Sequence, residues 1–193
     1  MLIALTGGVG CGKSSAAGFF GVTGYRVRDA DLIVREKVLT APEVITAVTA
    51  RWGKGVLRDT ENLNRAKIAE IVFANAIERR WLEQLVHPMV ETHWRKDVAM
   101  EPECDWIIEI PLLFEAGLEK GFDFVISVGA SECVQIARLI ARGMSEAQAR
   151  QRIASQLPLA YKLKFSNAVI WNDGDVAFLE AQVLHLVRNL SLG

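Results

Sequence analysis

The stretch "TGGVGCGKSS", residues 6–15, follows directly on the apolar run Leu2–Leu5 and determines how the rest of the chain is interpreted. Residues 7–14 have the spacing G-x-x-x-x-G-K-S, which is a P-loop pattern. Glycines let successive backbone N–H groups turn toward one anion, and a helix that begins at Lys13 directs its positive end to the same place. The stretch therefore predicts a phosphate-binding loop between a buried strand and a helix.

Two side chains in this loop carry chemistry of their own. In the P-loop pattern the lysine, here Lys13, reaches the terminal phosphates of a nucleotide, and the next hydroxyl, Ser14, is a ligand of Mg²⁺. A dinucleotide-binding fingerprint competes with this interpretation, but its third glycine would fall at the position of Lys13. We therefore set the dinucleotide interpretation aside.

The composition is that of a globular chain with a buried core. It has 193 residues, 51% of them hydrophobic and 23% charged, with a formal net charge of −1, so no global field attracts nucleic acid or an anionic membrane. The 3 cysteines form neither a disulfide framework nor a zinc spacing. No apolar run has the length of a membrane span, and the apolar start is too short for a signal peptide. We expect a cytoplasmic protein that binds neither nucleic acid nor membrane.

Apolar segments and helical periodicities alternate along the chain. Strands are predicted at residues 2–6, 25–28, 105–110, 122–129 and 169–171. Helices are predicted at residues 13–24, 32–39, 42–52, 64–94, 131–142 and 175–190, with two more that follow Ser145 and Pro158. We expect Asp31 to be an N-cap, Pro88 to kink or break its helix, and Ser145 to form a capping box with Gln148. This order predicts a parallel sheet with helices on both faces.

One domain is expected over residues 1–193. Its core takes in residues 1–40 and 101–193, and the helical segment 41–100 forms a lobe inserted into that core. The C-terminal ends of parallel strands lie at one edge of a sheet, so Asp29 and Asp31, after the second strand, are expected near the phosphate loop. A carboxylate there can accept a proton from an attacking hydroxyl, although a turn residue and a helix cap would show the same pattern.

Arginines gather in a predicted helical hairpin over about residues 138–157. Arg138 and Arg142 are four residues apart and share a helix face, and Gly143 forms the corner before the next helix. Such a hairpin can close over ATP and neutralise charge in a transition state, although a solvated basic face has the same pattern. A guanine-reading N-K-x-D motif is absent from the sequence, which disfavours a GTPase switch and leaves a small-molecule kinase.

Several motifs together resemble the dephospho-coenzyme A kinase family over nearly the whole chain. They are "LTGGVGCGKS", "DADLIVR", "LNRAKIAEIVFAN", "LEQLVHPMV", "IPLLFEAGLEKGFD", "ASQLP" and "NDG". The resemblance implies a three-layer α/β fold of the P-loop kinase type, with a five-stranded parallel sheet, a helical acceptor lobe and a helical lid. It also implies that ATP with Mg²⁺ phosphorylates the ribose 3′-hydroxyl of dephospho-coenzyme A, the last step of coenzyme A biosynthesis.

The same resemblance assigns roles to residues of this chain. It implies that Asp31 is the catalytic base and that Lys13, Arg138 and Arg142 stabilise the transferred phosphoryl group. It places the acceptor near Asp31 and near four further side chains, His87, Leu112, Leu113 and Glu115. The implied ATP-binding residues are Gly8, Gly10, Cys11, Gly12, Lys13, Ser14 and Ser15, and Ser14 is the implied metal ligand.

This sequence departs from the family pattern at a few positions. Cys11 stands where serine is usual, and a thiol near a helix N-terminus suggests either a lowered pKa with sensitivity to oxidation or an inert small side chain. Asn167 and Trp171 stand where acids are frequent. Two other functions stay open, a kinase for a nucleoside or nucleotide and a nucleotide-binding switch, and the sequence leaves the oligomeric state undetermined.

Overall fold

The computed structural model describes residues 1–59 and 62–190. It consists of two compact units, which we call the sheet unit (Met1–Asp29 with Pro102–Gly193) and the helical unit (Ala30–Glu101). The helical unit begins at Ala30, whereas the inserted lobe predicted from the sequence begins at residue 41.

The sheet unit contains a five-stranded sheet with the strand order β2-β3-β1-β4-β5, in which every pairing is parallel. The strands are β1 (Leu2–Gly7), β2 (Arg26–Asp29), β3 (Trp106–Glu109), β4 (Phe124–Gly129) and β5 (Ala168–Trp171). The predicted strands and the predicted fold class are thereby confirmed. Because β1 lies between β3 and β4, the loop that follows β1 leaves from the middle of the sheet edge.

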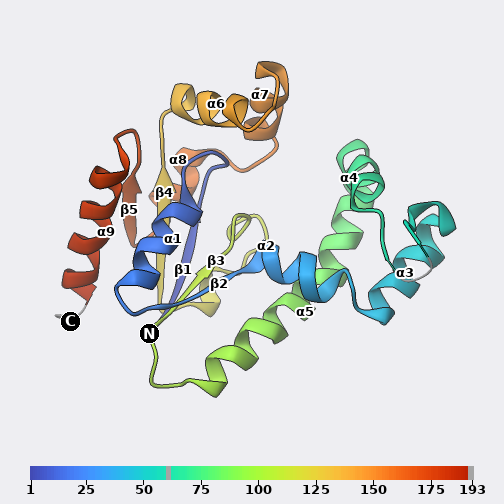
Figure 1. The fold of residues 1–193 in the computed structure, drawn as a ribbon, viewed down its shortest axis with the longest axis horizontal. Helices are drawn as coiled ribbons and strands as arrows, with labels where there is room; N and C mark the ends of the chain where they lie inside the picture. Colours follow the sequence, from blue (N-terminus) through green and yellow to red (C-terminus); the bar gives the residue numbers. More distant parts are fainter. Residues whose placement is uncertain (60–61, 191–193) are drawn as a thin grey trace. The chain divides into compact units, whose positions relative to one another are not determined.

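Helices cover both faces of this sheet, as predicted. They are α1 (Lys13–Val22), η3 (Glu119–Gly121), α6 (Glu132–Ala141), α7 (Glu146–Ala154), α8 (Leu159–Lys164) and α9 (Val176–Leu190). In Figure 1, α1 and α9 lie side by side on one face, and α6 and α7 lie beyond the carboxyl ends of the strands. On the other face α8 packs against β1 and β4, where Ser127 Oγ donates a hydrogen bond to the backbone oxygen of Lys162.

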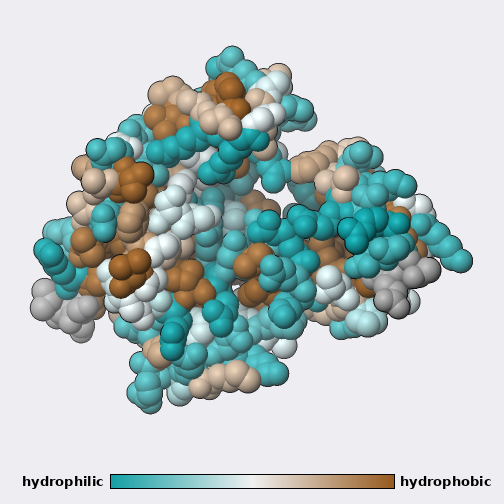
Figure 2. Space-filling view, viewed as in Figure 1, coloured by the Kyte–Doolittle hydropathy of each residue, from teal (hydrophilic) through white to brown (hydrophobic). Residues whose placement is uncertain are grey.

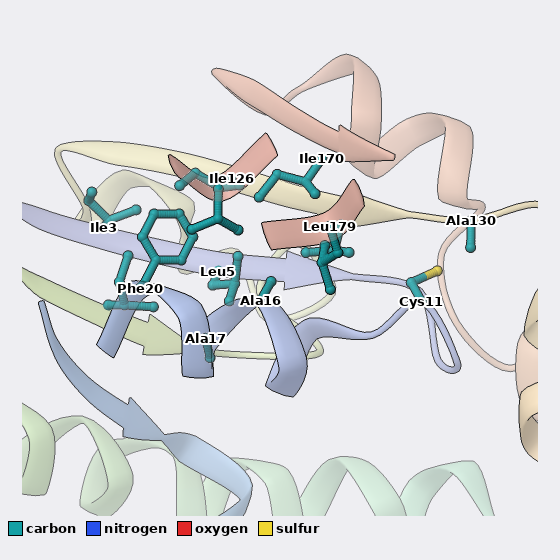
Figure 3. Packing of buried hydrophobic residues seen from close by; sticks show 13 residues of the cluster. Ile3, Leu5, Cys11, Ala16, Ala17, Phe20, Ile126, Ala130, Ile170 and Leu179 are labelled. Carbon is teal, nitrogen blue, oxygen red and sulfur yellow. The ribbon is translucent and has the colours of Figure 1, made fainter. Parts of the chain in front are cut away.

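The main core fills the space between the sheet and the pair α1 and α9 (Figure 3). Ile3 and Leu5 of β1 and Ile126 of β4 point into it, and Phe20 of α1 and Leu179 of α9 meet them from the other side. Alternate strand residues face this core because side chains of a strand point to opposite sides of the sheet. Burial of each such side chain contributes about 1.5–3 kcal/mol, which holds the phosphate loop at the end of β1 on a rigid support.

The helical unit is built from short and long helices. They are α2 (Ala30–Ile33), the π-helical turn η1 (Val34–Val38), α3 (Pro42–Trp52), η2 (Lys54–Val56), α4 (Arg65–Ala74) and α5 (Ala76–Met100). Asp31 lies in the first turn of α2, so its predicted place as an N-cap is wrong, because the helix already begins at Ala30.

The long stretch predicted at residues 64–94 is two helices. The interruption occurs at Asn75, whose side chain caps α5 by accepting N–H bonds from Ile77 (2.8 Å) and Glu78 (3.4 Å). Helix α5 continues through Pro88 without the break predicted there. Proline removes one hydrogen bond, and the remaining bonds with the packing of the buried Val90 and its neighbours keep the helix intact.

The face of the molecule seen in Figure 2 mixes hydrophilic and hydrophobic side chains. Apolar side chains gather over α1 and α9, where Val22, Val176 and Phe178 are exposed. Among the helices of the described residues, none is both long and apolar enough to cross a membrane.

Candidate active site

The phosphate loop, residues 7–14, leaves β1 at the carboxyl edge of the sheet and enters α1. Gly12 is the N-cap of α1, with a φ of +92°. A Cβ at this position would lie 2.3 Å from Nδ2 of Asn172, so any side chain would displace that amide. The N-terminus of α1 therefore meets the loop through backbone alone, which is the arrangement of an anion-binding site.

Lys13 lies at the predicted place in this loop. Its side chain is only 8% exposed, and Nζ donates hydrogen bonds to the backbone oxygens of Gly7 (3.3 Å) and Gly8 (3.0 Å). These acceptors are neutral, and a phosphate oxygen forms a stronger, charge-assisted bond with an ammonium group. The cation is thus held beside the loop and within reach of an anion there. Ser15 follows in the first turn of α1 and is exposed.

Ser14 is joined to an acid that the sequence analysis missed. Its Oγ donates a hydrogen bond of 3.0 Å to Oε1 of Glu109, the last residue of β3, which is 5% exposed. Glu109 is in register with Leu5 of β1 and Asp29 of β2, so acids of two strands lie at this edge. Hydroxyl and carboxylate oxygens are the ligands that Mg²⁺ prefers, so this donor set fits the ion. The available signal was a single acid at the end of the apolar strand "WIIE".

Cys11 is buried in the core rather than presented to solvent. Its side chain is 0% exposed and lies beside Ala130 at one end of the apolar cluster (Figure 3). Burial raises the pKa of the Cys11 thiol, because loss of hydration outweighs the nearby Lys13 ammonium. The hypothesis of a lowered pKa is therefore wrong, and burial favours the alternative of an inert small side chain.

Two side chains from distant parts of the sheet unit bind the carbonyls of the loop. Arg138 of α6 donates through Nη1 to the backbone oxygens of Gly10 (3.3 Å) and Cys11 (3.5 Å). Asn172, which follows β5 and is 4% exposed, donates through Nδ2 to the same oxygen of Cys11 at 2.8 Å. Arg138 thus reaches the loop, as expected of a lid arginine. Asn172 was not among the predicted site residues, although it begins the "NDG" stretch of the resemblance.

The helical hairpin α6–α7 forms as predicted. Its second helix begins with a capping box, in which Gln148 N–H donates to Ser145 Oγ (3.2 Å) and Ser145 N–H donates to Gln148 Oε1 (2.8 Å). Arg142 is the exposed C-cap of α6, one turn beyond Arg138. The structure therefore brings Arg138 to the loop, and the catalytic roles of Arg138 and Arg142 stay predictions.

The segment 111–117 connects β3 to η3 and contains the other predicted acceptor residues. Leu113 is 0% exposed and belongs to the interior, whereas Leu112 is partly exposed. Oε1 of Glu115 forms an ion pair with Lys162 Nζ (2.7 Å) and accepts a hydrogen bond from Leu157 N–H (3.0 Å). Contacts of Leu112, Leu113 and Glu115 with an acceptor stay predictions.

Two candidate residues belong to the helical unit. Asp31 is exposed in the first turn of α2, two residues along the chain from Asp29 at the end of β2, and a carboxylate is stabilised at such a helix N-terminus. His87 is partly buried in α5, and burial lowers the pKa of its imidazole although the Glu83 carboxylate acts in the opposite direction. The imidazole is therefore neutral at neutral pH.

Known proteins match this chain over nearly its full length. The family model described as dephospho-CoA kinase matches residues 1–177. A dephospho-CoA kinase from Synechococcus sp. (strain CC9902) is 43% identical over 184 residues, covering 94% of this chain and 92% of its own. A crystal structure of TT1252 from Thermus thermophilus superposes with a TM-score of 0.84 at 27% identity, covering 98% of this chain and 97% of its own.

A second solved structure, of dephospho-CoA kinase from Campylobacter jejuni, has a TM-score of 0.72 at 25% identity and covers 100% of this chain and 98% of its own. The phosphate loop, the parallel sheet and these matches lead to one assignment. This chain belongs to the dephospho-CoA kinase family.

Proposed function

We propose that this protein transfers the terminal phosphoryl group of ATP to the ribose 3′-hydroxyl of dephospho-coenzyme A, giving coenzyme A and ADP. Membership of the dephospho-CoA kinase family supports this reaction. The observation that carries it in this chain is the hydrogen bond between Ser14 and Glu109 beside the N-terminus of α1. It joins a hydroxyl and a carboxylate, both able to serve a metal, to a backbone site for phosphate.

On the ATP side, the loop from Gly8 to Ser15 would cradle the phosphates with its backbone N–H groups. Lys13 exchanges its carbonyl partners for the β- and γ-phosphates and places a positive charge where negative charge moves during transfer. Arg138 approaches from α6, and Arg142 follows when the hairpin of about residues 138–157 closes. These cations lower the barrier by electrostatic stabilisation.

Mg²⁺ would be held by Ser14, with Glu109 orienting the Ser14 hydroxyl. When bound, the ion neutralises phosphate oxygens and supplies Lewis-acid stabilisation. The residues of the chain supply orientation, since the buried Glu109 fixes which way the Ser14 hydroxyl points.

On the acceptor side, the carboxylate of Asp31 takes the proton of the 3′-hydroxyl as its oxygen forms a bond to the γ-phosphorus. The bond from that phosphorus to the β–γ bridging oxygen breaks, and the oxygen leaves on ADP. In this proposal residues 41–100, which include His87, are the acceptor lobe. Leu112, Leu113 and Glu115 are proposed to border the acceptor, and Leu113 does so from the interior.

The proposal is tested by ADP release from MgATP with one acceptor at a time. The acceptors are dephospho-coenzyme A, adenosine, AMP, CMP and none. Turnover that depends on dephospho-coenzyme A alone is the expected result. Turnover with a nucleoside or nucleotide in its place would contradict the acceptor, and tight nucleotide retention without acceptor-dependent turnover would favour a switch.

A further inference from the structure

A lysine lies wholly inside the sheet unit, outside the residues used by the reaction. Lys162 of α8 is 0% exposed, and its neighbour on the same helix, Lys164, is exposed. A buried ammonium is strongly unfavourable unless it is paired and hydrogen-bonded. Lys162 has both kinds of partner, since Nζ lies 2.7 Å from Oε1 of Glu115 and donates to the backbone oxygen of Pro111 at 3.0 Å.

Both partners belong to the segment 111–117, so one ammonium group binds this segment at its start and again at Glu115. The same carboxylate oxygen accepts the backbone N–H of Leu157, which lies between α7 and α8. The preceding residue, Gln156, accepts the N–H of Val9 in the phosphate loop at 3.0 Å. The chain that returns from the α6–α7 hairpin is therefore tied to the phosphate loop and to the segment 111–117 at once.

We infer that Lys162 is a positioning residue for the acceptor, which acts through Glu115 to hold the segment 111–117 in register with the phosphate loop. The inference rests on the proposed function, because it takes the acceptor to lie along that segment. The ammonium group is enclosed and touches no substrate, so its effect reaches the reaction only through the position of the segment. A displacement of about 1 Å at such a place changes catalysis by large factors.

Lys162→Met tests this, with Lys164→Met as the matched control on the same helix. We expect Lys162→Met to raise the KM for dephospho-coenzyme A about tenfold and to change the KM for ATP less than about twofold. Lys164→Met should leave both constants unchanged. Equal changes in the two KM values, or no change in either, would overturn the inference.

Glu115→Gln supplies a second route if the methionine variant folds poorly, because it removes the charge and keeps an oxygen that accepts hydrogen bonds. We expect a smaller rise in the KM for dephospho-coenzyme A from this variant. If Lys162 acts through Glu115, the double variant should raise the KM for dephospho-coenzyme A no more than Lys162→Met alone. Additive effects of the two substitutions would contradict that route.

Hydrogen exchange of the segment separates this inference from the proposed function. The amide of Ala116 bonds to Leu112 oxygen at 3.0 Å, and that of Leu118 bonds to Leu113 oxygen at 3.1 Å. These amides should exchange faster in Lys162→Met than in Lys164→Met, whatever the acceptor proves to be. Unchanged exchange would show that Lys162 does not hold the segment. Failure of the wild type to phosphorylate dephospho-coenzyme A would overturn the function instead.

Discussion

The phosphate loop and the helical unit are held by different kinds of contact. The loop is bound by side chains from distant parts of the sequence, since Arg138, Gln156 and Asn172 all bond to its backbone. In the helical unit, the described polar contacts include helix caps such as Asn75 and the surface pair of Arg51 with Glu78. The first is a fixed main-chain cradle, whereas the second is a set of packed and capped helices.

This difference matches the proposed role of each region. The phosphates are the same in every nucleoside triphosphate, so a motif of backbone conformations suffices to bind them. In the proposed function the acceptor is particular to the reaction, and its selection would fall to side chains outside the phosphate loop. Substitutions in the two regions should therefore have different signatures.

Asp31→Asn should have the largest effect, and it should fall on chemistry alone. The amide cannot take the proton, so kcat should drop roughly 10²- to 10⁴-fold while the dissociation constant of ATP changes little. Steady-state turnover measures kcat, and nucleotide titration measures the dissociation constant of ATP. Glu70→Gln, an exposed acid on α4, is the control. Near-normal turnover of Asp31→Asn across the pH range would leave Asp31 with only a helix-terminal role.

Lys13→Met should lower kcat/KM about 10²- to 10³-fold with any acceptor, because the proposed function places its charge beside the phosphates. Lys120→Met, at an exposed lysine of η3, should match the wild type. A loss that depended on which acceptor was supplied would contradict a role of Lys13 in phosphate binding alone. Kinetics with the acceptor panel measure this.

Glu109→Gln should lower activity about tenfold and shift the Mg²⁺ requirement to higher concentration. The amide can still accept the Ser14 hydrogen bond at the same place, but the charge that orients the hydroxyl and attracts the ion is gone. Activity is measured as a function of Mg²⁺ at fixed ATP. A titration curve that overlays that of the wild type would remove Glu109 from the metal site.

Gly12→Ala should destabilise the protein more than Gly143→Ala does, although both glycines have φ near +90° (+92° and +91°). At Gly143 the added Cβ meets open space, so only backbone strain of about 1 kcal/mol is expected. At Gly12 it displaces the buried Asn172 amide from the Cys11 carbonyl, which adds about 1–3 kcal/mol. Denaturant unfolding measures both, and equal losses would contradict a tightly enclosed loop.

Protonation of His87 should have the smallest effect, a pH dependence of the free energy of unfolding. Burial lowers its pKa below 6.5 in the folded state, so the unfolded chain binds the proton more readily. The free energy of unfolding should fall as pH drops through that value and recover above it. His87→Gln should flatten this component between about pH 5 and pH 7. An unchanged profile would show that His87 does not cause it.

Much of the fold could be predicted, because short apolar segments alternate with helical periodicities and a P-loop follows the first apolar segment. The boundary between α4 and α5 at Asn75 could not be predicted, because Pro88 has the stronger local tendency to interrupt a helix. Packing and the Asn75 cap determine where the helices end and begin. Lys13 and Ser14 follow from a motif. Glu109 and Asn172 could not be predicted as site residues, because their importance arises from contacts made only after the chain folds.

Transfer of phosphate to the ribose 3′-hydroxyl can be followed in one reaction, with dephospho-coenzyme A and MgATP, by ³¹P NMR and mass spectrometry of the product. We expect a new phosphomonoester on the ribose 3′ position, formed in step with ADP, and a product with the mass of coenzyme A. ADP formed without a phosphorylated acceptor, or a phosphate on another hydroxyl, would contradict the proposed function.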